Sequence, residues 1–207
     1  MTAETGPIAP LPEDHVVEPG APADSLRVEN VWDYVESIDR WIEERPDDER
    51  LFARLADGRW IPVADPAAWP EGTVVGAGVL IDATGVVRQV FIAPVEGPDS
   101  TFIVYTHVFD EDGKTVFFER TASFHGGECT PGKAHETATY IFDEEARLVS
   151  KTYELVDDGD QPLDPARCAV ARRDDYRIER SVGALLRGTG LDAVVHAVSD
   201  RRVPVIS

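Results

Sequence analysis

Two neighbouring segments carry side chains that could transfer protons. Tyr105, His107 and Glu119 lie on either side of a predicted tight turn, in runs rich in Val, Phe and Thr that favour strands. If Asp110 pairs with Lys114 across that turn, Tyr105 faces Glu119 and His107 follows one pair along. A histidine base needs a carboxylate to hold one tautomer, and a tyrosine can donate to a substrate oxygen. We therefore expect His107 or Glu119 as the general base and Tyr105, or alternatively Tyr153, as the donor to the substrate oxygen.

Other side chains of this hairpin and the next could line a small-molecule pocket, because such pockets combine aromatic rings with a few polar groups. The ligand-binding candidates are Phe109, Phe117, His125, His135, Lys151 and Tyr153. The same pairing rule places Lys151 and Tyr153 on the side of His135 in the next hairpin. A slip of one residue would exchange the two faces and make Arg120 a candidate carboxylate anchor. The alternative is that this face is the polar outer surface of the sheet.

The glycine-rich stretch that begins at His125 and ends at His135 admits three interpretations. Two glycines followed by Lys133 have the spacing of a phosphate loop, but Ala134 stands where that loop needs Ser or Thr. His125, Cys129 and His135 are ligand types that zinc accepts, although their spacing matches no zinc pattern known to us. The interpretation that we favour is a long hairpin connection, so we expect no metal and no cofactor.

One repeated pattern predicts β-hairpins. An apolar residue precedes Asp, two turn residues follow, a small residue comes fourth in the turn, and a strand rich in apolar residues returns. The pattern occupies residues 81–87, 109–115 and 142–148. The Asp side chain can bond the backbone two residues on, and Gly85 and Gly113 tolerate the positive φ of a type I turn with a bulge. Ala146 fits that position less well, but three hairpins remain the prediction, with six consecutive strands.

The remaining segments predict a tail and a few shorter elements. Five prolines and five acids make an acidic, disordered tail of residues 1–24. Asn30 can cap an amphipathic helix that ends near Pro46. One β-rich domain over residues 25–207 should follow the tail. Its expected parts are helices over about 30–56, with a short second helix near 51–55, a β-meander over about 59–182 that includes an edge strand at 59–63 and a strand pair at 167–171 and 176–182, and a helical segment over about 183–199.

About seven to nine strands with short connections must curl or close, because a flat sheet of that size leaves unpaired edges. We therefore expect a mainly β (α+β) fold, an antiparallel up-and-down meander with an N-terminal amphipathic helix. Its closed form resembles the calycin barrels. The alternative is a cone-shaped sheet around the N-terminal helix, similar to the nuclear-transport-factor-2 class. Both resemblances are architectural.

The charge balance excludes some partners. The chain has 20 basic and 39 acidic residues, for a net charge of −19. That charge repels nucleic acid and anionic membranes, and no stretch approaches the roughly 18 apolar residues of a membrane span. Two cysteines, Cys129 and Cys168, are expected to be reduced thiols. A cytoplasmic protein with neither nucleic acid nor membrane as partner is the expectation.

Binding of a small apolar molecule is the function that fits these features best. Its enzymatic form would be a cofactor-independent isomerase, cyclase or lyase that works by general acid–base chemistry. One alternative is an acidic interaction protein, such as an immunity protein, an inhibitor or a nucleic-acid mimic. Another is a metal-dependent enzyme that uses the 125–135 stretch. The helices and exposed strand edges also leave a homodimer open.

Overall fold

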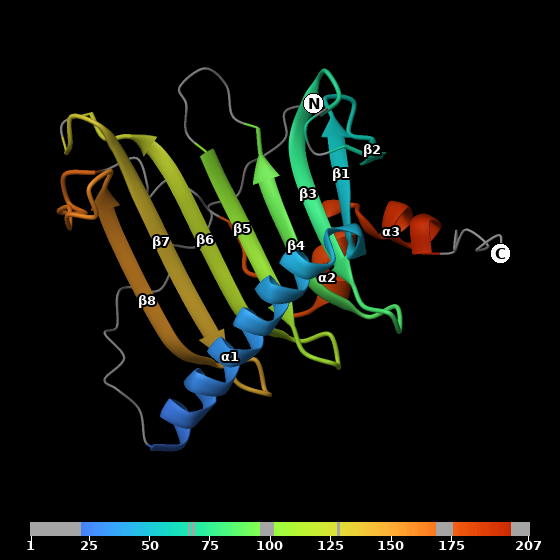
Figure 1. Cartoon of the computed structure of the whole chain (residues 1–207), viewed down its shortest axis with the longest axis horizontal. Helices are drawn as coiled ribbons and strands as arrows, with labels where there is room; N and C mark the ends of the chain where they lie inside the picture. The colour runs from blue at the N-terminus through green and yellow to red at the C-terminus, as the bar shows by residue number, and fades with distance from the viewer. Residues whose placement is uncertain are drawn as a thin grey trace, which may run out of the picture.

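One eight-stranded antiparallel sheet organises the chain, with strand order β2-β1-β3-β4-β5-β6-β7-β8 (Figure 1). This structure is a computed structural model, and it describes residues 22–65, 67, 69–95, 102–127, 129–168 and 176–199. From β3 onward each strand pairs with the next, which confirms the predicted meander. The strands are β1 (Glu49–Leu55), β2 (Trp60–Val63), β3 (Thr73–Ile81), β4 (Val87–Pro94), β5 (Phe102–Phe109), β6 (Thr115–His125), β7 (Lys133–Phe142) and β8 (Leu148–Asp157). The helices are α1 (Pro22–Glu44), the 3₁₀ turn η1 (Pro46–Asp48), α2 (Val182–Thr189) and α3 (Asp192–Ser199).

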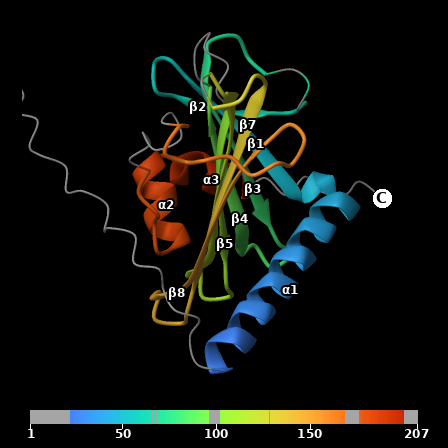
Figure 2. The same ribbon diagram turned by 90° about the vertical axis from the view of Figure 1, so that its left-hand side faces the viewer.

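The sheet stays open, so the expected calycin-like barrel is wrong. β2 and β8 form its two edges. Figure 2 shows α1 on one side of the sheet and α2 and α3 on the other. Helices on both sides bury the apolar faces, which removes the need for closure. Pro62 lies in β2, at the edge where its missing N–H costs least, as the sequence predicted.

Two helix boundaries differ from expectation. Helix α1 begins at Pro22 rather than near Asn30, so the last residues of the expected tail are helical; residues 1–21 lie outside the described part of the chain. The predicted short helix at 51–55 is strand β1. Its apolar residues were spaced ambiguously, and pairing with β3 decides the matter: Phe52 lies opposite Ala77, and both are fully buried.

Each face of the sheet has its own core. Under α1, Val35 and Ile38 pack against the sheet residues Leu80, Val108 and Ile141. The buried face of α1 is the apolar stripe that the sequence pattern indicated. On the opposite face, α2 and α3 pack their apolar side chains onto β1, β3 and β4; the buried helix residues are Leu185, Leu186, Leu191 and Val195. The strands in the middle are therefore buried on both sides.

The end of the chain confirms the helical segment but not the last strand pair. Ser181 caps α2 by accepting a hydrogen bond from the Ala184 N–H, and Gly190 ends the helix with a φ of 77°. Residues 176–180, expected as a strand, have no regular structure. Their backbone instead lies on the β5–β6 turn, where Thr115 N donates to Arg180 O at 3.1 Å. The expected partner strand at 167–171 lies mostly outside the described residues.

Four turns share one chemistry. In each, an Asp side-chain oxygen accepts the backbone N–H groups two and four residues on, at 2.8 to 3.0 Å; the four residues are Asp82, Asp110, Asp143 and Asp157. The first three are the predicted hairpin turns, which are confirmed. Gly85 and Gly113 have φ of 88° and 75°, while Ala146 adopts 58° without being glycine. The Asp side chain therefore holds the turn even where the residue type is unfavourable.

A bulge follows each predicted turn and changes the register. In each hairpin the pairing register shifts by one residue because the returning strand carries one residue with no partner opposite it. These residues are Arg88, Val116 and Val149. Beyond the bulge, Tyr105 pairs with Arg120 rather than Glu119. The register derived from the turn alone is therefore wrong on both polar hairpins, because one inserted residue moves every later side chain to the other face.

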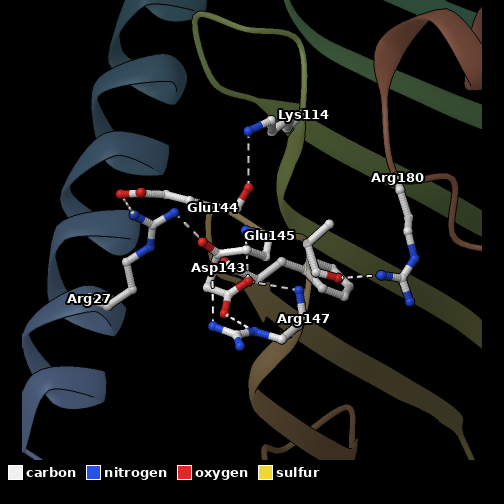
Figure 3. Close-up of polar contacts among 9 residues, drawn as sticks. Arg27, Lys114, Asp143, Glu144, Glu145, Arg147 and Arg180 are labelled. Carbon is white, nitrogen blue, oxygen red and sulfur yellow. Dashed lines mark hydrogen bonds and ion pairs between the residues drawn. The ribbon is translucent and has the colours of Figure 1, made fainter.

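The β7–β8 turn joins three parts of the molecule (Figure 3). Arg27 of α1 pairs with Glu144 at 3.3 Å, and Lys114 of the β5–β6 turn donates to Glu144 O at 3.0 Å. From the other side, Arg180 donates to Ala146 O at 2.6 Å. Each of these contacts is exposed and individually weak. Together they fasten α1 and the segment before α2 to one end of the sheet.

A disulfide joins Cys129 to Cys168, so the expectation of reduced thiols is wrong. It links the β6–β7 connection to the segment after β8, with a Cα–Cα distance of 5.4 Å. The sequence separation of 39 residues hid this proximity, which β7 and β8 create by running to the end of the sheet and back. Among the described residues, no helix is both long and apolar enough to cross a membrane.

Candidate functional site

The bulge in the central hairpin separates the predicted acid–base residues. Tyr105 and His107 face the side of the sheet that carries α2, whereas Glu119 lies on the side of α1. Thr139 Oγ1 donates to the Glu119 carboxylate at 3.4 Å, and burial raises the pKa of that carboxyl. His107 pairs with Phe118 in the ladder. The predicted His107–Glu119 and Tyr105–Glu119 pairs are therefore not formed.

His107 is a fully buried, neutral imidazole. Its side chain has no exposed surface, and its ring lies 4.8 Å from the Phe118 ring and 5.8 Å from the Tyr176 ring, between centroids. Desolvation lowers its pKa to about 3, because a charged imidazolium cannot be solvated there. Neither ring nitrogen has a hydrogen-bond partner among the described residues. At neutral pH it is therefore a weak base with two unused polar atoms.

Tyr176 completes this cluster, and the sequence did not point to it. Its ring stacks on Tyr105 with centroids 3.8 Å apart and planes 9° apart, and it lies 5.7 Å from Phe118. The Tyr176 hydroxyl is buried without a hydrogen-bond partner in the part of the chain that the structure describes. Burial raises its pKa above the ordinary value for tyrosine. Tyr176 comes from the segment before α2, so no local signal could have placed it here.

An ion pair borders the aromatic cluster. The bulge brings Arg120 to the face of Tyr105, as the sequence predicted for a slipped register. Arg120 Nη2 lies 3.1 Å from Glu136 Oε2, and the two side chains are 15% and 2% exposed. Such a buried pair is costly to break from one side, since the remaining charge would be left in a poor solvent. The Arg120 guanidinium therefore already forms an ion pair with Glu136, so it does not serve as the anchor for a substrate carboxylate in this structure.

The other predicted ligand residues are dispersed. Phe109 packs in the core under α2, and Phe117 packs under α1, with its ring 5.3 Å from Trp32. Lys151 and Tyr153 lie on β8 opposite Tyr140 and Ala138, so they share a face with Tyr105 rather than with His135. Lys151 Nζ lies 5.4 Å from the centre of the Tyr140 ring, and Tyr153 is 42% exposed.

His125 is the last residue of β6 and His135 lies within β7, so the predicted hairpin connection is confirmed but is shorter than expected, at residues 126–132. The disulfide occupies the sulfur of Cys129, so that residue supplies no thiolate to the weak metal alternative. No group of three potential ligands forms within the described ranges. His135 instead contacts Ser123 Oγ through Nδ1 at 2.6 Å and Asp158 Oδ1 through Nε2 at 2.9 Å.

Two surface grooves run along α1, away from the predicted site. The larger has a volume of about 450 Å³, and its lining residues include Arg27, Tyr34, Ile38, Arg88 and Glu111. None of the predicted catalytic or ligand-binding residues lines it. Arg88 is held there by Asp82, whose carboxylate lies 2.8 Å away. Burial raises the pKa of Asp82, but hydrogen bonds from Thr84, Val86 and Arg88 outweigh it and lower the value to about 2.

Comparison with known proteins assigns no family. No protein-family model matches the sequence. No curated protein matches it, and no solved structure does. The geometry of the side chains is therefore the basis for any functional conclusion.

Proposed function

We propose that the protein binds a small, planar, largely apolar molecule in the position that the Tyr176 ring fills between Tyr105 and His107. The carrying observation is a set of three buried polar atoms with no partner among the described residues: both ring nitrogens of His107 and the Tyr176 hydroxyl. Each such atom costs about 1–3 kcal/mol of stability. Buried polar atoms in folded proteins normally have hydrogen-bond partners, so a cluster without them calls for an explanation. A ligand hydroxyl or amide that forms a hydrogen bond with His107 would provide that explanation.

The surroundings suit such a ligand. The rings of Tyr105, Phe118 and Tyr176 are nearly parallel, with interplanar angles of 9° to 15°. A flat aromatic molecule could replace Tyr176 in this stack and retain its favourable contacts. The segment that carries Tyr176 is anchored beyond it, where Thr115 Oγ1 donates to Glu179 O at 2.7 Å. Binding at this position would require the Tyr176 ring to leave the stack while the chain after Glu179 stays anchored.

Binding is a better proposal than catalysis at this position. With a pKa near 3, His107 would accept a substrate proton poorly at neutral pH. Glu119, the other predicted base, lies on the opposite side of the sheet. An isomerase, cyclase or lyase would need a further proton acceptor. The resemblance to the nuclear-transport-factor-2 class stays part of the proposal, supported by α1 lying along one face of the sheet (Figure 2).

Thermal unfolding with a panel of planar aromatic metabolites tests the proposal. A ligand at about 100 times its Kd stabilises the folded state by about 2.7 kcal/mol, which raises Tm by roughly 5–10 °C for a chain of this size. Tyr176→Ala should bind the same ligand more tightly, because it vacates the position. Tyr153→Ala, on the exposed edge strand, is the matched control and should behave as wild type. If the folded Tyr176→Ala protein is stabilised by no member of the panel, the proposal fails.

An acidic interaction protein is the second candidate. The net charge of −19 and the apolar side chains on edge strand β8, Leu148 and Tyr153, both more than 40% exposed, favour it. A basic partner, or a second copy across β8, would use these features. Capture that weakens strongly with added salt would support the charged partner. A monomer that captures nothing at low salt would oppose it.

The cellular location also remains a proposal. The sequence suggested the cytoplasm, whereas disulfides persist mainly in oxidising compartments. Titration of free thiols in protein taken directly from its natural host would decide between the two.

A further inference from the structure

We propose that Ser123 is a nucleophile, activated by His135 and Asp158, at a second site that cleaves esters or other activated acyl groups. This site is independent of the proposed binding position. Ser123 and His135 lie on the α1 side of the sheet, and Tyr105 and His107 lie on the other side. The two proposals can therefore fail separately.

Three consecutive strands bring the residues together. Ser123 of β6 and His135 of β7 are directly paired in the ladder, and Ser123 Oγ lies 2.6 Å from His135 Nδ1. Asp158 follows the end of β8 and places Oδ1 at 2.9 Å from His135 Nε2. Its other oxygen, Oδ2, accepts the Lys133 backbone N–H at 2.9 Å. Ser123 and His135 are held on paired strands, which position side chains more rigidly than loops do, and Asp158 lies in the turn directly after β8.

The hydrogen bonds dictate where the imidazole proton lies. An ionised carboxylate can only accept, so Asp158 requires the proton to be on Nε2 of His135. The lone pair of Nδ1 then faces the Ser123 hydroxyl and can accept its proton. The bond to His135 and the bond from the Lys133 backbone lower the pKa of Asp158, which keeps the carboxylate ionised. The logic is that of a Ser–His–Asp triad with the two ring nitrogens exchanged.

The site is accessible. The side chains of His135 and Asp158 are 41% and 58% exposed. Helix α1 lies across this face of the sheet at the end that is far from the β6–β7 connection (Figure 1). It therefore does not cover β6 and β7 where they meet that connection. Phe102 pairs with Ser123 across β5 and β6 and is 60% exposed. Its ring offers an apolar surface for the substrate.

Nearby donors could stabilise the charge that develops on a substrate carbonyl oxygen. Thr137 and Thr121 form the next row of the ladder on the same face as His135 and Ser123. Lys133 follows in the other direction, paired with His125, and is exposed. Hydroxyl and ammonium groups beside the nucleophile are the kind of donor that acyl transfer needs. His125, another predicted ligand residue, lies on the same face in the row that it shares with Lys133.

The reaction balances without a cofactor. Ser123 Oγ attacks the ester carbonyl carbon, and its proton moves to His135 Nδ1. The tetrahedral intermediate breaks its bond to the alcohol oxygen, and His135 returns the proton to that leaving group. Water then attacks the acyl-Ser123 ester with His135 as base, which releases the carboxylic acid and restores the serine.

A fluorophosphonate probe tests the nucleophile directly. After incubation of the full-length, disulfide-intact protein, peptide mass mapping should place the adduct on Ser123. Ser123→Ala should abolish it, and Ser150→Ala, a serine of the same face on β8, should leave it unchanged. His135→Gln and Asp158→Asn should each slow labelling at least about tenfold, since general-base assistance is worth roughly a hundredfold or more. Circular dichroism and thermal unfolding verify that each variant is folded.

Turnover of p-nitrophenyl acetate gives the second measurement. Hydrolysis should fall in Ser123→Ala and in Asp158→Asn. The proposal is overturned if folded wild-type protein forms no adduct on Ser123. It is also overturned if folded Asp158→Asn labels as fast as wild type, which would leave the three residues as a surface hydrogen-bond network.

Discussion

Opening the disulfide should cost the protein about 4 kcal/mol of folding stability. The bond closes a loop between two cysteines that are 39 residues apart in sequence. In the chain-entropy treatment a loop of this length removes about 13 cal/mol/K from the unfolded chain, which is about 4 kcal/mol at 25 °C. The effect arises because the open unfolded chain gains conformations that the closed one lacks.

Denaturant unfolding measures this loss in two ways. One sample is the wild type, oxidised or reduced, and the other is Cys129→Ala/Cys168→Ala. Reduction leaves both sulfur atoms in place, so it separates loop entropy from the small cavity that alanine creates at Cys168, which is 3% exposed. Both open forms should lose similar stability, with a larger dependence on denaturant because their unfolded chains are more expanded.

Two results would refute this reasoning. A loss below about 1 kcal/mol in both open forms would mean that the loop is already restricted in the unfolded chain. Two free thiols in the unreduced, unfolded protein would mean that the bond does not form. The second result would also restore the reducing compartment that the sequence suggested.

Two further predictions concern the sheet. A Cβ atom at Gly78 would overlap the Phe91 ring across β3 and β4, so Gly78→Ala should lower the free energy of unfolding in urea by about 1–3 kcal/mol. At Gly188 in α2 a Cβ atom meets nothing within 4 Å, so Gly188→Ala should raise that free energy by about 0.5–1 kcal/mol. Equal effects of the two substitutions would contradict the packing argument. Burial lowers the pKa of His107 from 6.5 in the unfolded chain to about 3 in the folded protein. At a pH between these two values, His107 takes up a proton only when the chain unfolds. Stability should therefore fall by about 1.4 kcal/mol per pH unit as pH drops below about 6.5, and His107→Leu should remove that part of the slope; an unchanged slope would show that the imidazole is not buried and neutral.

The disulfide and the Ser123–His135–Asp158 group lie at the same end of the sheet. Cys129 belongs to the β6–β7 connection, and Lys133, where that connection ends, holds Asp158 through its backbone N–H. Reduction of the disulfide should therefore lower the folding stability and also slow the labelling of Ser123 by the fluorophosphonate probe. Both effects have the same physical origin, because both depend on how firmly this connection is held.

Local chemistry made much of the fold predictable. The three hairpin turns follow from Asp82, Asp110 and Asp143, whose side chains bond their own backbone and need no distant partner. The edge position of β2 follows from Pro62. The helical end of the chain follows from Ser181 at its start and a glycine at its turn. In each case the deciding contact lies within a few residues, so the sequence alone contains it.

The faces of the sheet depend on contacts that no short window contains. Each bulge inserts one residue into the returning strand, and no residue type near Val116 marks that position in the sequence. The slip moved Glu119 away from His107 and brought Arg120 to Glu136.

The candidate sites depend even more on tertiary structure. Tyr176 reaches Tyr105 from a segment about 70 residues away in the chain. Asp158 reaches His135 only because β7 and β8 pair in one register. The sequence by itself determined the local elements: the hairpin turns, the apolar stripe of α1 and the helices at the end of the chain, where the interacting atoms are near neighbours in the chain. Tertiary structure decided the register, the disulfide and the side chains that share a site, since those depend on strand pairing and on packing between segments distant in sequence.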